Sequence, residues 1–201
     1  MNHLTLALAA LLVPSMALAQ APAPAGATQA AAVAPAPPEA PKPAPETKAF
    51  EFLIGDWMHD ETWTEAAAGA ADRAKGLSRS QLILGDHVLQ IMYKANMTKL
   101  GAVEARGFLR YDSEKRVYVF DWMTSRGTAI HMEGVLDGKA LVFQGERTFR
   151  GQVRREKLTL SPQDDGSVLQ RTEVTGADGA FVPAVEGKIT PKPKPAEAPK
   201  P

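Results

Sequence analysis

Residues 87–111, HVLQIMYKANMTKLGAVEARGFLRY, carry the pattern that decides the fold. From Leu89 to Met97, apolar residues stand at every second position with mainly polar residues between them. The same alternation returns from Val103 to Tyr111 after a short link. Side chains alternate across a β-strand, so each half predicts a strand with one face toward a core. The short link predicts that the two strands are antiparallel neighbours.

Outward from this pair, similar runs continue in both directions at intervals of roughly 8–12 residues, which is typical of an all-β sandwich or barrel. We expect ten strands, at residues 57–65, 77–84, 87–97, 103–111, 116–124, 128–136, 140–149, 153–160, 167–175 and 181–189. Turn signals such as Asp137-Gly138 join consecutive strands. Short links favour an up-and-down antiparallel meander, and ten strands resolve their exposed edges best by closing into a barrel. Residues 47–54 predict one short helix before the first strand.

Proline marks the limits of this domain. Of the 16 prolines in the 201-residue chain, 14 lie outside residues 47–190, and this segment is long enough to bury a core. Residues 20–46 hold eleven alanines and eight prolines, and residues 191–201 hold five prolines and three lysines. Such compositions cannot form a core. We therefore predict a disordered linker before the barrel domain and a disordered tail after it.

Residues 1–19 predict a secretory signal peptide. An apolar run from Leu4 to Val13 leads to Ala17-Leu18-Ala19, which is a small-x-small cleavage site. The run is about ten residues long, well short of the roughly twenty that span a bilayer. We expect cleavage after Ala19, no membrane span in the mature protein, and a periplasmic or secreted location.

Composition excludes several functional classes. The chain carries 23 basic and 23 acidic residues. Because no segment has a basic excess, we expect no nucleic-acid partner. The absence of cysteine excludes disulfides, thiolate zinc sites, iron–sulfur clusters and thiol nucleophiles. His59, His87 and His131 fall on different strands without ligand spacing, so we expect no metal site.

The predicted inward faces mix apolar with polar side chains. In strand 57–65, Trp57, His59, Glu61 and Trp63 share one face, and a titratable pair between two indoles is costly to bury unless it is hydrogen-bonded or meets a ligand. For strand 116–124 we favour the aromatic face as inward. The residues predicted to bind a ligand are His59, Glu61, Trp63, Tyr93, Tyr111, Trp122, Arg147 and Gln170.

This set of residues predicts a small-molecule pocket with apolar and aromatic walls. The alternative is a barrel filled by its own side chains. In that case His59, Glu61 and Arg147 would satisfy one another in a buried polar network.

The segment Phe52-Leu53-Ile54-Gly55-Asp56-Trp57 resembles the F-L-x-G-x-W motif of a bacterial lipocalin-like family of unknown function. The resemblance continues in residues 107–112, 115–122 and 133–139. It implies a closed calycin-type barrel over residues 47–190 that binds a small apolar or amphipathic ligand, with no established reaction.

The same resemblance implies two residue roles. In calycins the tryptophan of Gly-x-Trp commonly closes one barrel end, often under an arginine. Gly55 and Trp57 would then close the barrel, with Arg147 or Arg171 as a cation–π partner of the indole. Nitrobindin-like barrels of similar strand count bind haem through a histidine. Here His59 is the inward candidate and its surroundings do not match their motif, so we expect no cofactor.

Three functional hypotheses follow. The leading one is an exported carrier or sensor that binds a small apolar or amphipathic molecule. The second is an envelope interaction module that uses its proline-rich arms. The third is an enzyme with His59 and Glu61 as an acid–base pair, although the sequence lacks a Gly-x-Ser-x-Gly, phosphate-loop or His-Glu-x-x-His motif. The sequence does not indicate an oligomeric state.

Overall fold

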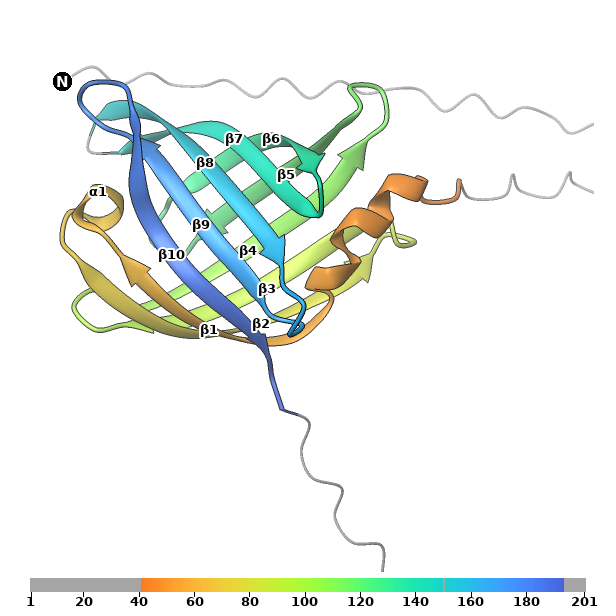
Figure 1. The fold of residues 1–201 in the computed structure, drawn as a ribbon, viewed down its shortest axis with the longest axis horizontal. Helices are drawn as coiled ribbons and strands as arrows, with labels where there is room; N and C mark the ends of the chain where they lie inside the picture. The colour runs from red at the N-terminus through yellow and green to blue at the C-terminus, as the bar shows by residue number, and fades with distance from the viewer. Residues whose placement is uncertain (1–40, 150, 194–201) are drawn as a thin grey trace, which may run out of the picture. The chain divides into compact units, whose positions relative to one another are not determined.

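The computed structural model describes residues 41–149 and 151–193. Ten antiparallel strands form a closed barrel, with a 3₁₀ helix and a one-turn α-helix beside it (Figure 1). In chain order the elements are η1 (Pro45–Leu53), β1 (Gly55–Trp63), α1 (Glu65–Ala68), β2 (Asp72–Ile83), β3 (Val88–Met97), β4 (Gly101–Asp112), β5 (Val117–Thr124), β6 (Ala129–Asp137), β7 (Ala140–Phe149), β8 (Gln152–Pro162), β9 (Val168–Thr175) and β10 (Phe181–Pro191).

Each strand pairs with its neighbour in the chain, and β1 pairs with β10 to close the ring. The closing register runs from Trp57 opposite Pro191 to Trp63 opposite Val185. The predicted ten-stranded up-and-down barrel is therefore confirmed. Turn chemistry follows the sequence signals, since Gly138 adopts a positive φ of 60° between β6 and β7.

The clearest differences from the prediction concern β2 and the two helices. Strand β2 begins at Asp72, five residues before the expected start at Leu77. Helix η1 begins at Pro45 and is a 3₁₀ helix. The single turn of α1 was not predicted. Its four residues, Glu65–Ala68, are too few to show a helical hydrophobic period.

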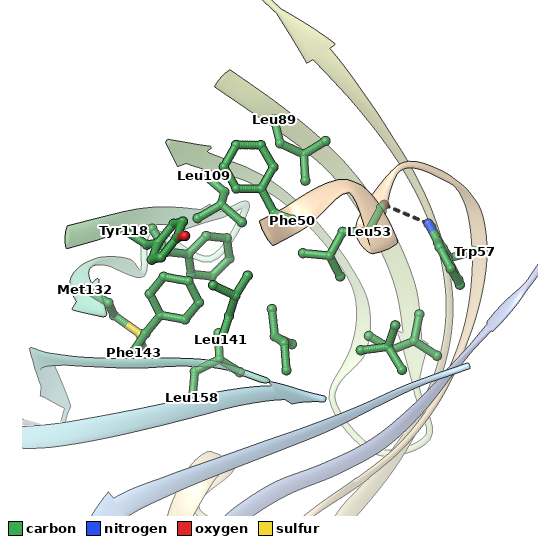
Figure 2. Close-up of a cluster of buried hydrophobic side chains, with 14 of the residues drawn as sticks. Phe50, Leu53, Trp57, Leu89, Leu109, Tyr118, Met132, Leu141, Phe143 and Leu158 are labelled. Atoms are coloured by element: carbon green, nitrogen blue, oxygen red, sulfur yellow. Dashed lines mark hydrogen bonds between the residues drawn. The ribbon is translucent and has the colours of Figure 1, made fainter. Parts of the chain in front are cut away.

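Helix η1 covers one end of the barrel, which we call the closed end. In a 3₁₀ helix, side chains three residues apart share a face, and this places Phe50 and Leu53 together against the interior. Figure 2 shows both side chains directed at the apolar cluster of the barrel interior. The indole Nε1 of Trp57 donates a 2.9 Å hydrogen bond to the carbonyl oxygen of Leu53. Trp57 thus joins the first strand to the helix, and its role in closing the barrel stays a prediction.

The opposite end carries α1 and the hairpins that follow β3, β5, β7 and β9. The buried Ala67 of α1 packs against Val174, Ala184 and Val185. The backbone N–H of Thr64 donates to the carbonyl oxygen of Ala184. Helix α1 is therefore held against the β9–β10 side of this end.

Several predicted segments lie outside the described residues. They are the signal peptide at 1–19, the linker up to residue 40 and the tail from residue 194 onward. Among the residues that are described, no helix is long and apolar enough to cross a membrane.

Candidate functional site

A cavity of about 300 Å³ lies inside the barrel. All ten strands contribute side chains to its wall. It extends from Leu53 and Trp57 at the closed end to Leu100 and Arg126, in the hairpins of the opposite end. The volume is at the lower end of the range usual for small-molecule pockets.

Aromatic residues shape one side of the cavity. The Trp122 ring lies 5.7 Å from the ring of Tyr93 and 5.7 Å from that of Phe120, measured between centroids. Gly107 makes this arrangement possible, because a Cβ there would lie 2.7 Å from the indole of Trp122. The bare backbone of β4 is thus the surface on which the Trp122 ring rests.

Glu61 is the centre of a buried polar network, with 2% of its surface exposed. Its Oε2 accepts hydrogen bonds from Trp63 Nε1 at 2.9 Å and from the Tyr93 hydroxyl at 3.0 Å. Its Oε1 lies 3.2 Å from Nδ1 of His59. Burial, reinforced by the charge of Glu61, raises the pKa of the Tyr93 phenol far above its usual range. Tyr93 therefore stays a hydrogen-bond donor to the carboxylate.

His59 links Glu61 to a hydroxyl on the neighbouring strand. Its Nε2 lies 2.8 Å from the Oγ of Ser78 on β2, which is itself buried. In the register of β1 and β2, Ser78 lies opposite Trp57. Alternation along the two strands therefore brings the serine and the histidine to the same wall of the cavity.

A second buried charged pair lies on β7 and β8. The Nε of Arg147 lies 2.5 Å from Oε2 of Glu156, so the two side chains form a buried ion pair. The guanidinium also lies 5.3 Å from the Phe149 ring centroid and donates a long bond to the carbonyl oxygen of Ala67. Burial raises the pKa of Glu156, although the charge of Arg147 opposes the rise. The pair is thus a second charged group on the cavity wall.

Seven of the eight residues predicted to bind a ligand lie on the cavity wall; these are His59, Glu61, Trp63, Tyr93, Trp122, Arg147 and Gln170. Their role in binding stays a prediction. The eighth, Tyr111, does not line the cavity. It sits near the end of β4, where its ring packs 5.2 Å from that of Tyr118. Tyr118 in turn donates to the backbone of Glu46 in η1, so this tyrosine pair belongs to the closed end.

Neither of the two arginines expected to stack on Trp57 does so. Arg147 lies on β7 near the end opposite η1 and stacks on Phe149. Arg171 faces outward and pairs with Glu173. The indole of Trp57 is instead fixed by its hydrogen bond to Leu53. The suggested network of His59, Glu61 and Arg147 also divides in two, because Arg147 pairs with Glu156 and not with Glu61.

Two residues of the site, Ser78 and Glu156, were missed. Glu156 had a signal, because it precedes the inward residues Leu158 and Leu160 by two and four positions. For Ser78 the signal was ambiguous, since the adjacent Leu77 competes for the inward face and is in fact half exposed.

The residues present do not suit a haem bound through His59. Both of its ring nitrogens are hydrogen-bonded, one to Glu61 and one to Ser78, so the ring presents no free axial nitrogen. Within residues 41–149 and 151–193, no three histidine, aspartate or glutamate side chains cluster in a way that could hold a metal ion.

Comparison with solved structures supports the fold. Rv2717c from M. tuberculosis is similar at a TM-score of 0.55 with 10% identity, covering 76% of this chain and 100% of that chain. The S-type phycobiliprotein lyase CPES from Guillardia theta gives a TM-score of 0.47 at 8% identity, covering 74% and 93% of the two chains. A fluorescence-activating β-barrel designed de novo gives 0.38 at 14% identity, covering 72% and 97%.

No curated protein matches the sequence. A family profile does match it, over residues 42–190. This range includes the whole of η1 and all ten strands except Pro191, the last residue of β10. The chain therefore belongs to the DUF1579 family of proteins of unknown function.

Proposed function

We propose that the barrel binds one compact amphipathic molecule in its cavity, as an exported carrier or sensor. The observation that carries this proposal is the cavity of about 300 Å³, whose wall combines aromatic and aliphatic side chains with two buried polar groups. Transfer of an apolar ligand body from water to such a wall is favourable in proportion to the apolar area it covers.

The two polar groups have different parts in this proposal. The Glu61 carboxylate already accepts from Trp63 and Tyr93 and faces His59, so it needs no ligand to satisfy it. The ion pair of Arg147 and Glu156 lies on the same cavity wall, and polar contacts are stronger in such a low-dielectric site than in water. A polar head group on the ligand would face this second pair.

Fluorescence of 1-anilinonaphthalene-8-sulfonate, an amphipathic probe, tests the proposal. Ala105 is buried on the cavity wall, whereas Ala102 on the same strand is exposed on the outside. Ala105→Phe fills the cavity, and we expect it to weaken probe binding at least ~10-fold, the loss of about 1.4 kcal/mol. Ala102→Phe should bind as the wild type does.

Thermal unfolding followed by circular dichroism checks that both variants are folded. If a folded Ala105→Phe protein binds the probe as tightly as Ala102→Phe, the probe does not occupy the cavity and the proposal is wrong. In a separate experiment, native mass spectrometry of the wild-type protein from its own host identifies any bound natural ligand by its mass.

The export part of the proposal rests on the sequence of residues 1–19. The apolar run and the Ala17-Leu18-Ala19 site are typical of cleaved signal peptides. We expect the protein recovered from a periplasmic extract or the medium to have the mass of a chain that begins at Gln20. A chain recovered from the cytoplasm with residues 1–19 attached would contradict export.

A further inference from the structure

We propose that Ser78 is a nucleophile for acyl transfer, with His59 as its general base and Glu61 as the residue that orients the base. The substrate class is a small carboxylic ester that enters the cavity. This inference goes beyond binding, and it rests on the proposed function only in requiring that the cavity admits an ester.

The three side chains have the connectivity of a serine–histidine–carboxylate triad. The Ser78 hydroxyl lies 2.8 Å from Nε2 of His59, and Nδ1 of the same ring lies 3.2 Å from Oε1 of Glu61. Such triads are recognised by this geometry and not by chain order or fold. All three residues line the cavity, so the hydroxyl faces the space where an ester would lie.

The surroundings of Glu61 select the tautomer that the chemistry needs. Trp63 Nε1, which is only a donor, and the Tyr93 hydroxyl both donate to Oε2. Oε1 is then left to accept from Nδ1–H of His59. We assign the ring proton to Nδ1 on this ground. The lone pair of Nε2 therefore faces the Ser78 hydroxyl, as proton abstraction requires.

The reaction has two steps, acylation of Ser78 and hydrolysis of the acyl-serine. As Ser78 Oγ bonds to the ester carbonyl carbon, its proton moves to His59 Nε2. The bond from that carbon to the alcohol oxygen breaks, and the departing oxygen takes the proton from His59. Water then attacks the acyl-serine with His59 again as base, which releases the carboxylic acid and restores the Ser78 hydroxyl.

The strand context limits the rate. Backbone N–H groups in the middle of β1, β2 and β3 are used in the barrel ladders, so they are not free to form an oxyanion hole of the usual kind. We therefore expect acylation by activated esters and slow deacylation. With p-nitrophenyl acetate, this predicts a burst of about one p-nitrophenol per protein followed by slow turnover.

The test is the burst and the site of the acetyl group. We expect Ser78→Ala to abolish the burst, and peptide mass mapping of the wild type to place the acetyl group on Ser78. Ser80→Ala is the matched control. Ser80 is the next residue on the same face of β2, and both nitrogens of His59 are already engaged by other partners. Acetylation of His59 or of a lysine in place of Ser78, or a burst in Ser78→Ala, would overturn the proposal.

Glu61→Gln tests the positioning role of Glu61. The amide oxygen would take the donors Trp63 and Tyr93, and its NH₂ would face Nδ1 of His59, so the ring proton moves to Nε2. We expect the burst rate to fall at least ~100-fold, while ¹⁵N chemical shifts of His59 report the exchanged tautomer. If the tautomer changes and the burst rate does not, His59 is not the base.

Binding of 1-anilinonaphthalene-8-sulfonate, measured on the same variants, separates this inference from the proposed function. If the wild-type protein binds the probe and is not acetylated at Ser78, the nucleophile proposal is wrong and the binding proposal stands. If it is acetylated at Ser78 and does not bind the probe, the binding proposal is wrong and the nucleophile proposal stands.

Discussion

A buried carboxylate persists in a protein only when several donors replace its lost water. Glu61 meets this condition through Trp63, Tyr93 and His59. We predict that Tyr93→Phe lowers the free energy of unfolding by about 1.5–3 kcal/mol, the usual contribution of a hydrogen bond to a charged group. Urea unfolding followed by circular dichroism measures this loss.

Tyr111→Phe is the control for the Tyr93 substitution. Its ring packs on Tyr118 and lies off the cavity wall. It should lose far less stability, because its hydroxyl has no hydrogen bond to another described side chain or backbone group. Equal losses in the two variants would mean that the hydrogen bond to Glu61 contributes little.

Glu156 carries a pH dependence of known sign. Burial raises its pKa in the folded state, against the opposing charge of Arg147. A group whose pKa rises on folding contributes stability that is complete below its unfolded pKa and is lost as pH rises through the folded pKa. We predict that the free energy of unfolding of the wild type, minus that of Glu156→Gln, falls as pH rises above about 4.3, the pKa of a glutamate in the unfolded chain.

Glu104 provides the comparison of opposite sign. The hydrogen bond and charge of Lys94 lower the pKa of this exposed carboxylate. Its contribution is present above the unfolded pKa and is lost as pH falls, so the difference between wild type and Glu104→Gln should rise with pH. If the stability difference between wild type and Glu156→Gln also rises with pH, the charge of Arg147 has a larger effect on the pKa of Glu156 than burial has.

At the scale of elements, η1 determines whether the barrel has a closed end. Phe50 is completely buried against the interior cluster (Figure 2). Truncation of a buried phenylalanine typically costs about 3–5 kcal/mol, so we predict a loss of that size in Phe50→Ala, measured by urea unfolding. Phe52 on the same helix is partly exposed, so Phe52→Ala should lose less free energy of unfolding. Similar losses would indicate that η1 does not depend on its buried face.

The strands of this barrel are readable from sequence because nearly every one places apolar residues on a single face. Strand β2 departs from this rule. Among its first residues, from Asp72 to Gly76, Ala74 is the one apolar side chain on the buried face. Asp72 is buried there because backbone N–H groups of Lys99 and Leu100 donate to it. These partners lie in a distant hairpin, so no local pattern could predict them.

In the candidate site too, some residues could be predicted from a local pattern and others could not. His59 and Glu61 could be placed inside the barrel by counting along β1, since Trp57 fixes the face. Ser78 faces inward from a strand whose Leu77 points out. Its hydrogen bond with His59 depends on the register between β1 and β2. Register is a tertiary property, so the sequence alone could not place Ser78 beside His59.

At the scale of the whole molecule, closure is the one non-local step. Nearly all strand pairing joins neighbours in the chain, and the exception is the pairing of β1 with β10 (Figure 1). Non-local pairing is slow to form, because the entropy of loop closure must be overcome before any contact compensates for it. Until β10 docks, β1 and β9 present open edges.

A pair of truncations tests the dependence on closure. A chain that ends at Gly179 lacks β10, and with it the cavity-wall residues Ala184, Val185 and Ile189. We predict that it has no cooperative thermal transition by circular dichroism and aggregates in size-exclusion chromatography. A chain that ends at Pro193 keeps every described strand and should unfold at the wild-type midpoint. If the shorter chain unfolded cooperatively, the nine-stranded remainder would be stable with open edges, and the pairing of β1 with β10 would not be what holds the cavity together.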